Sequence, residues 1–239
     1  MNLNRPPVIR PGFFGLEAAA DSRRHVFDAH NEAHLAENVL IDAVFIGDSI
    51  TDWWALDAFF EGASGFVVNR GIGGDRTPFV RRRFDADVLQ LQPRFVVVQI
   101  GVNNTWDLDT PWDPSVYRTP NEIEDEIVTD VEAMVAIARE REIVVALGSI
   151  LPTNIPYKGT TDMRNDLILR ANGRLRDVAT RHAAIYVDYH SHLTVEDGKT
   201  LRRELADDGL HPHVVGYRIM AKVLLEALAT AGITFIKPR

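Results

Sequence analysis

The sequence contains no cysteine, which excludes disulfide bonds, thiolate metal sites and cysteine nucleophiles. It also lacks any apolar run near the roughly 18 residues that a membrane span requires, so we expect no membrane span. The first residues hold prolines but no apolar leader segment. With no sign of export, the sequence predicts a cytoplasmic protein.

An excess of positive charge is also missing, because 26 Lys and Arg residues face 34 Asp and Glu residues and give a net charge of -8. Phosphate backbones and anionic lipids attract clustered basic residues, so we expect no nucleic-acid partner. The basic residues that do cluster are Arg76, Arg81, Arg82 and Arg83. A run of this kind predicts the solvated face of a helix.

What remains is an ordinary globular composition. The 239 residues are 46% hydrophobic and 25% charged, which is enough apolar material for one large core. We therefore predict a single domain over residues 1–239, with an N-terminal arm at 1–20, a leading helix at 21–38 and the core at 39–230.

Strand-like and helix-like segments alternate along that core. Apolar runs rich in β-branched residues occur at 39–46, 66–69, 95–100, 143–149 and 184–189. Near-continuous apolar runs are typical of parallel strands covered on both faces. Helical spacing of apolar residues separates them, most clearly at 120–141, where Thr119 and Glu122 form a capping-box pattern. The alternation predicts a three-layer α/β/α sandwich with a central parallel sheet of about five strands, of the flavodoxin type.

In such folds ligands bind beyond the carboxyl ends of the strands. The first strand is followed by Gly47, Asp48 and Ser49. Ser49 has two interpretations here, the N-cap of the next helix or an exposed nucleophile. The G-x-S-x-G elbow is absent, which disfavours a conventional α/β-hydrolase.

The next two strand ends carry groups suited to binding negative charge. After the second strand stand Gly71, Gly73 and Gly74, whose backbone can approach a ligand closely and donate an amide. A nucleotide loop is the rival interpretation, but the G-K-[ST] signature is missing. After the third strand, Asn103 either makes a turn or presents its amide to developing negative charge.

The segment "DDGLHPH" near the C-terminus supplies a carboxylate and an imidazole. Asp208 lies three residues before His211, close enough to fix its tautomer, and Asp207 is the local competitor. Asp208, His211 and His213 also suggest a metal site, but no further ligand motif supports one. We expect no metal and no cofactor.

Taken in order, these four segments resemble the motif blocks of the SGNH (GDSL-type) hydrolase family, over residues 39–217. The segments "NRGIGGD" and "GVNN" are most similar to the branch related to platelet-activating-factor acetylhydrolase. The resemblance implies a Ser49, Asp208 and His211 triad, with Gly74 and Asn103 as oxyanion donors beside the amide of Ser49. Ile50 replaces the Leu of the family motif, and Val102 stands where this branch often has Thr.

The resemblance also implies a function, a serine esterase that removes small acyl groups, chiefly O-acetyl, from a carbohydrate or another small ester. A lipid-directed esterase or lysophospholipase of the same family and a catalytically silent binding module remain as alternatives. We expect the partner to be a small-molecule ester, while self-association into a homo-oligomer stays open. Four residues beside the motifs are the predicted substrate contacts: Asp48, Asn104, Trp106 and Trp53.

Overall fold

The computed structural model describes residues 5–16, 18–60, 65–110, 113, 115, 117–156 and 159–235. Its centre is a parallel sheet with the strand order β2-β1-β3-β4-β5. The strands are β1 (Ile41–Gly47), β2 (Phe66–Gly71), β3 (Phe95–Gln99), β4 (Val144–Gly148) and β5 (Ile185–Val187). Each predicted strand run overlaps one of them, and the order is that of flavodoxin-like folds, which confirms the predicted fold class.

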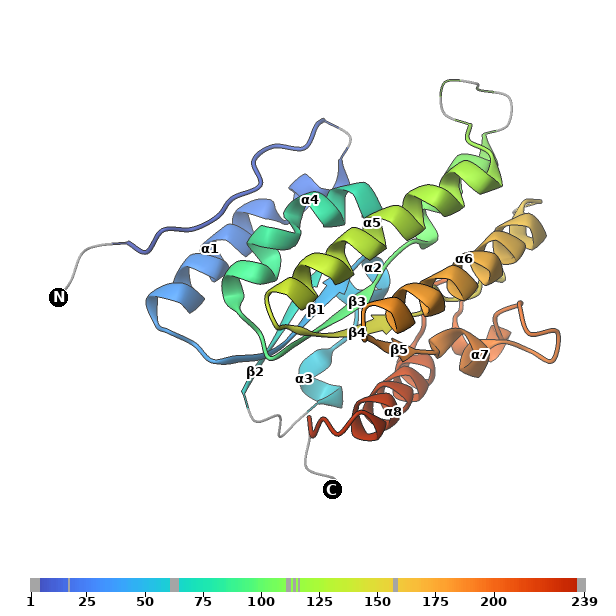
Figure 1. The fold of residues 1–239 in the computed structure, drawn as a ribbon. Helices are drawn as coiled ribbons and strands as arrows, with labels where there is room; N and C mark the ends of the chain where they lie inside the picture. Colours follow the sequence, from blue (N-terminus) through green and yellow to red (C-terminus); the bar gives the residue numbers. More distant parts are fainter. Residues whose placement is uncertain are drawn as a thin grey trace.

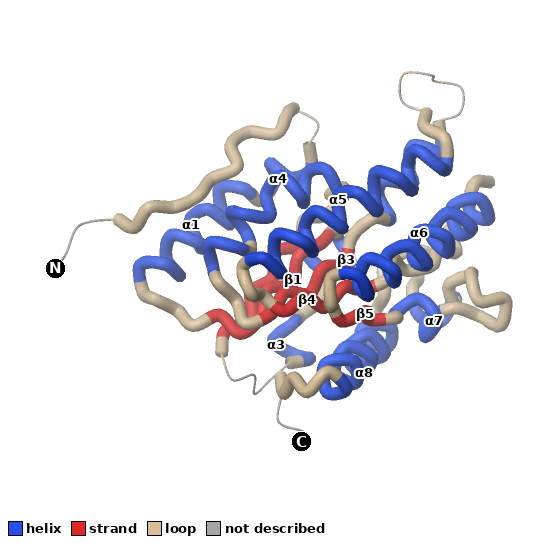
Figure 2. Tube along the Cα trace, in the orientation of Figure 1, coloured by secondary structure: helices blue, strands red, loops and turns tan. Residues whose placement is uncertain are grey.

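Helices cover both faces of this sheet (Figures 1 and 2). One layer consists of α1 (Arg24–Ala36), α4 (Thr77–Asp87), α5 (Pro120–Glu140) and α6 (Thr161–Arg181). On the other side lie α3 (Leu56–Phe59) and α8 (Val214–Thr230), while the short helices α2 (Ser49–Asp52) and α7 (Tyr189–Leu193) follow β1 and β5. Four 3-10 turns, η1 (Ala19–Ser22), η2 (Leu89–Leu91), η3 (Val102–Asp109) and η4 (Arg203–Leu205), complete the regular structure of the described ranges. The capping box predicted from Thr119 and Glu122 is present at the start of α5.

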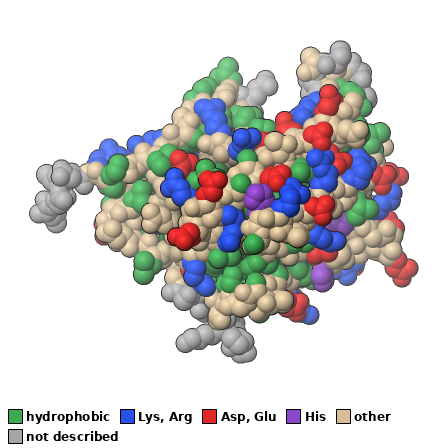
Figure 3. Space-filling model, viewed as in Figure 1, with side chains coloured by type: hydrophobic (Ala, Val, Ile, Leu, Met, Phe, Trp, Pro, Cys, Tyr) green, Lys and Arg blue, Asp and Glu red, His purple; other side chains and the backbone are tan. Residues whose placement is uncertain are grey.

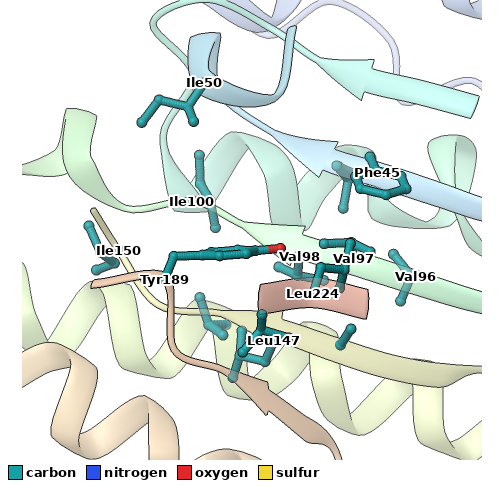
Figure 4. Packing of buried hydrophobic residues seen from close by; sticks show 14 of the residues in the cluster. Phe45, Ile50, Val96, Val97, Val98, Ile100, Leu147, Ile150, Tyr189 and Leu224 are labelled. Carbon is teal, nitrogen blue, oxygen red and sulfur yellow. The ribbon is translucent and has the colours of Figure 1, made fainter. Parts of the chain in front are cut away.

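The core surrounds the central strands. Every residue of β1 and β3 is buried, as expected of strands that are covered on both faces. In Figure 4 the ring of Tyr189 lies among the side chains of Ile100, Val98 and Leu147, all of them buried. Because this packing fixes the strand ends, the loops that follow them start from defined positions.

Strand register brings three of the predicted motifs together. Gly47, the last residue of β1, pairs with Gly71 of β2 on one side and with Gln99 of β3 on the other. The loops that carry Ser49, the glycine-rich turn and Asn103 therefore leave the sheet side by side.

The N-terminal segment runs over α4 and joins α1 through η1. Residues 5–15 show no helix or strand, and residues 1–4 and 17 of the predicted arm lie outside the described residues. Phe14 packs edge-on against Phe79 with ring centroids 6.0 Å apart. Arg82 donates hydrogen bonds to the carbonyls of Pro11 and Phe13. The segment is thus anchored to α4 by aromatic and polar contacts.

The outer surface of the helical layer is mixed in charge. Acidic and basic side chains alternate over α5 and α6 in Figure 3, and several pair across the two helices, as Glu124 does with Arg170 at 2.9 Å and with Arg174 at 3.1 Å. In the part of the chain that the structure describes, no helix is long and apolar enough to cross a membrane.

Candidate active site

Ser49 is the first residue of α2, and its hydroxyl is not used to cap that helix. The cap is Asp48, whose Oδ1 accepts a hydrogen bond from the amide of Ile50 at 2.9 Å. The Ser49 Oγ instead lies 2.8 Å from Nε2 of His211, 162 residues further along the chain. The interpretation of Ser49 as the helix N-cap is therefore wrong.

His211 and Asp208 complete a chain of hydrogen bonds from the serine. Nδ1 of His211 lies 2.5 Å from Oδ2 of Asp208, and Oδ1 of Asp208 accepts from the backbone amides of Leu210 and His211. Partial burial opposes the charged form of Asp208, but the bonds from His211 and from these amides outweigh it and lower the pKa of Asp208. Asp208, rather than Asp207, is thus the carboxylate that orients the imidazole.

Gly74 lies in the turn that follows β2, where Asp75 N donates to Ile72 O at 3.1 Å. Its φ of 80° falls in the left-handed region, which glycine adopts without a steric penalty. Both Gly73 and Gly74 are exposed, and a Cβ on Gly73 would lie 3.8 Å from Cβ of Ser49. This turn therefore lies against the serine with its backbone open to a ligand.

The side chain of Asn103 is held at both ends. Its Nδ2 donates to the carbonyl of Asp75 at 3.0 Å, and its Oδ1 accepts from Nε1 of Trp106 at 2.7 Å. An amide nitrogen carries two N–H groups, and the bond to Asp75 occupies one of them. The two anchors fix which way the amide faces and tie η3 to the glycine-rich turn.

The four predicted substrate contacts differ in how far they are exposed. Trp53 is 58% exposed and stacks on His211 with ring centroids 4.1 Å apart. Trp106 is partly buried under the guanidinium of Arg164, which lies 4.5 Å from its ring centroid. Trp53 thus keeps exposed surface beside His211, and Trp106 keeps some beside Asn103. A role for either in binding substrate stays a prediction.

Asp48 and Asn104, which the sequence also predicts as substrate contacts, lie in the interior. Neither has exposed surface, so neither can contact a substrate in this structure. Burial, together with the nearby charge of Asp75, raises the pKa of Asp48 to about 7, against the opposing effect of the hydrogen bond from the amide of Ile50. Asn104 bonds to Thr77 and to Glu126, and so joins η3 to α4 and α5. Both residues support the site from inside.

Arg83 departs from the predicted solvated helix face, because its side chain is fully buried. Its guanidinium donates to the carboxylates of Asp75 and Asp87 at 2.8 and 2.9 Å, and to the carbonyls of Arg70 and Gly47 at 2.9 and 3.1 Å. Sequence reasoning missed this residue. The available signal was the inward stripe of α4, because Val80, three residues before Arg83, and Asp87, four residues after it, are also buried and share a helix face with it.

The suggested metal set does not assemble. The Nδ1 of His213 accepts from the amide of Val215 at 3.2 Å and caps α8. Within the described ranges, no group of three or more His, Asp or Glu side chains is arranged to hold a metal ion. His211 is engaged by Ser49 and Asp208 instead.

A mainly apolar groove includes Trp53, the residue that stacks on His211. It has a volume of about 890 Å³ and is lined by Trp53, by Ala58 and Phe59 of α3 and by residues of α8. The α8 residues include Tyr217 and Leu225 together with the charged Lys222. The groove is large enough for a ligand or substrate portion of several hundred Å³.

Known proteins share both the sequence pattern and the fold. The model of the GDSL-like lipase/acylhydrolase family matches residues 45–219. An acetylxylan esterase from Geobacillus stearothermophilus is 26% identical over 224 residues, which cover 82% of this chain and 96% of that protein. The crystal structure of a GDSL-like lipase from Bacteroides thetaiotaomicron has a TM-score of 0.72 and 26% identity, covering 89% of this chain and 99% of that one. A Streptococcus pneumoniae structure named for platelet activating factor has a TM-score of 0.67 and 26% identity, with 88% and 92% covered.

The family match spans all four motif segments and most of the sheet. It confirms the resemblance drawn from "GDS", "NRGIGGD", "GVNN" and "DDGLH". The chain belongs to the GDSL-like lipase/acylhydrolase family and is an ester hydrolase.

Proposed function

We propose that this chain is a serine esterase that removes small acyl groups, chiefly O-acetyl, from a carbohydrate or another small ester. The observation that carries the proposal is the continuous chain of hydrogen bonds from Ser49 through His211 to Asp208. Its three members come from two distant segments of the sequence, and such a juxtaposition is the recurring geometry of an activated serine nucleophile.

The proposed reaction uses each member in turn. His211 accepts the proton of Ser49 at Nε2 while Oγ attacks the ester carbonyl carbon. The resulting tetrahedral intermediate collapses as His211 returns the proton to the leaving alcohol, which leaves an acyl-serine. A water molecule then repeats the sequence against the acyl-serine and releases the acid. Asp208 holds the imidazole tautomer and stabilises its charged form throughout.

Negative charge on the former carbonyl oxygen needs fixed donors. We assign the backbone amides of Ser49 and Gly74 and the second N–H of Asn103 to this role. Support comes from the anchoring of the Asn103 amide by Asp75 and Trp106 and from the exposed backbone of Gly74. Donors that are fixed in advance need no reorganisation when the charge develops.

The preference for small acyl groups rests on the acetylxylan esterase relative and on the half-exposed indole of Trp53 beside the triad. An exposed aromatic face is well suited to stacking on a sugar ring. In this assignment the acyl group lies over the glycine-rich turn and the sugar lies toward the aromatic side.

The direct test uses p-nitrophenyl acetate and a fluorophosphonate probe. The wild-type protein should hydrolyse the ester and acquire one adduct at Ser49, while Ser49→Ala should do neither. Asp208→Asn should lose most of the activity, and Asp207→Asn is the matched control that should keep it. A wild-type protein that resists the probe and hydrolyses no ester would favour the silent binding module and refute the proposal.

A lipid-directed esterase is the second candidate, and the groove that includes Trp53 favours it. Its length along α8 and its apolar lining of Ala58, Phe59 and Leu225 suit an acyl chain better than a sugar. A series of p-nitrophenyl esters separates the two functions. A kcat/KM that is highest for acetate supports small-acyl removal, whereas a maximum at roughly eight or more carbons, a chain length that such a groove can hold, supports the lipid esterase.

A further inference from the structure

We propose that Trp53 is a positioning residue that holds the imidazole of His211 in the orientation needed for proton transfer, and that this role matters most after the acyl-enzyme has formed. The proposal rests on the esterase function proposed above. It is carried by the stacking of the two rings, whose centroids lie 4.1 Å apart with 30° between their planes.

Trp53 owes its place to the short helix that begins at Ser49. Its backbone amide donates to the carbonyl of Ser49 at 2.9 Å, so it stands one helical turn beyond the nucleophile as the C-cap of α2. The next residue, Trp54, points into the core and is 3% exposed, whereas Trp53 is 58% exposed. A large aromatic side chain is thus kept at the surface, in contact with the imidazole.

The stack restrains a motion that the hydrogen bonds leave open. His211 is bonded at Nδ1 by Asp208 and at Nε2 by Ser49, on opposite sides of its ring. Two such bonds fix the line that joins the nitrogens but allow the ring to rock about that line. The indole of Trp53 covers one face of the ring and limits this rotation, which keeps the Nε2 lone pair aimed at the reacting oxygen.

The acyl-enzyme makes this restraint more important. Once the Oγ of Ser49 is esterified it has no proton to donate, so of the three contacts described above His211 keeps those with Asp208 and Trp53. In this state Nε2 must accept a proton from water as the water oxygen bonds to the acyl carbon. That proton then passes to Oγ as the Oγ–carbon bond breaks, which regenerates Ser49 and releases the acid. Deacylation therefore depends on Trp53 more than acylation does.

Steady-state kinetics with p-nitrophenyl acetate separate the two steps. Its good leaving group makes kcat report deacylation, while kcat/KM reports acylation. For Trp53→Leu we expect kcat to fall by about tenfold and kcat/KM by less than about threefold, with a stopped-flow burst that reveals accumulated acyl-enzyme. Trp53→Phe keeps an aromatic ring against the imidazole and should restore kcat to within about threefold of wild type.

Trp54→Phe is the matched control. It should lower thermal stability, because Trp54 packs against Phe45 and Tyr217, and it should leave the ratio of kcat to kcat/KM unchanged. Trp53→Ala is the second variant, because it removes the ring without requiring new packing.

The possible outcomes are distinct. Unchanged kinetics in Trp53→Leu and Trp53→Ala, or an equal fall in kcat and kcat/KM, would overturn the positioning role. Failure of Trp53→Phe to recover kcat would overturn it as well. If the wild-type protein gave no fluorophosphonate adduct at Ser49, the esterase function itself would fall, and the role of Trp53 with it.

Discussion

The guanidinium of Arg83 donates to the carboxylate of Asp75 at 2.8 Å, and neither side chain has any exposed surface. The same guanidinium donates to the carbonyl of Gly47, at the end of the strand that leads to Ser49. The carbonyl of Asp75 in turn accepts from the amide of Asn103. One buried cation thus ties together the three loops that carry the proposed nucleophile and oxyanion donors.

Arg83→Met should destabilise the fold strongly. Met fills much of the same volume, but Asp75 would remain buried without its cation, whereas Asp87 would keep its two bonds from Arg24. Breaking a buried pair in this way costs about 3 to 5 kcal/mol, which urea unfolding at neutral pH would measure.

Arg81→Met provides the comparison on the same helix. Arg81 is half-exposed and pairs with Asp130 at 3.1 Å, so its loss should cost less than about 1 kcal/mol. Equal and small losses for the two variants would contradict the role given to the buried network.

Asn103→Ala should lower kcat for p-nitrophenyl acetate by about 10²- to 10³-fold, or about 3 to 4 kcal/mol of transition-state stabilisation. The affinity for substrate should change much less, because the lost hydrogen bond strengthens only as negative charge develops. Purified protein with the wild-type circular dichroism spectrum and a kcat within about twofold of wild type would argue against an oxyanion role.

Trp106→Phe should give a milder form of the same defect. It removes the N–H that holds Oδ1 of Asn103, while the bond from Asn103 to Asp75 remains. Loss of one neutral hydrogen bond is worth about 1 kcal/mol, so we expect kcat to fall by about fivefold. A larger defect than that of Asn103→Ala would mean that Trp106 acts on the substrate directly.

The sequence predicts the sheet well because its signals are local. Apolar runs mark all five strands, and the capping box at Thr119 marks the start of the longest predicted helix. The three motifs that follow β1, β2 and β3 were also visible, because a parallel sheet places its strand ends along one edge. The family resemblance added the pairing of Ser49 with His211, which residue spacing alone could not supply.

Side-chain direction was harder to predict because it depends on distant partners. Arg83 points inward owing to Asp75, Asp87 and Gly47, whereas its neighbour Arg82 reaches the N-terminal segment. The adjacent residues Trp53 and Trp54 diverge because α2 ends at Asp52, so helical periodicity does not determine which indole is buried.

Asp48 should make the stability of the fold depend on pH in an unusual direction. Burial raises its pKa from 3.8 to about 7, so between these values the folded protein holds a proton that the unfolded chain has released. Stability is therefore greatest below pH 4 as far as this group is concerned, and it falls as the pH rises toward 7. The shift corresponds to a loss of about 4 kcal/mol of stability at most.

Asp48→Asn should remove this loss. Its amide oxygen can still accept from Ile50 and cap α2, and it carries no charge at any pH. The stability of the variant relative to wild type, measured by urea unfolding, should increase between pH 4 and pH 8. Parallel stability curves for the two proteins would show that Asp48 does not titrate in this range.

Gly209 lies between Asp208 and His211 and sets the course of the loop that carries both residues. It adopts a φ of 77°, and a Cβ there would lie 2.1 Å from the carbonyl oxygen of Asn154. The backbone at Asn154 also donates to the carbonyl of Gly209 at 2.8 Å. Gly209→Ala would force these two segments apart and displace the imidazole from Ser49.

Gly198→Ala separates that effect from backbone strain, because Gly198 has a φ of 72° and no atom within 4 Å of the added Cβ. Strain alone should cost about 1 kcal/mol in either variant. Gly209→Ala should cost more than this in urea unfolding and should also lower kcat/KM for p-nitrophenyl acetate at least tenfold, roughly the effect of misplacing a reacting group by 1 Å or less. Gly198→Ala should retain wild-type kinetics. If both variants lost the same stability and kept full activity, the loop would tolerate the added methyl group, and the close approach of Asn154 would not be what places His211.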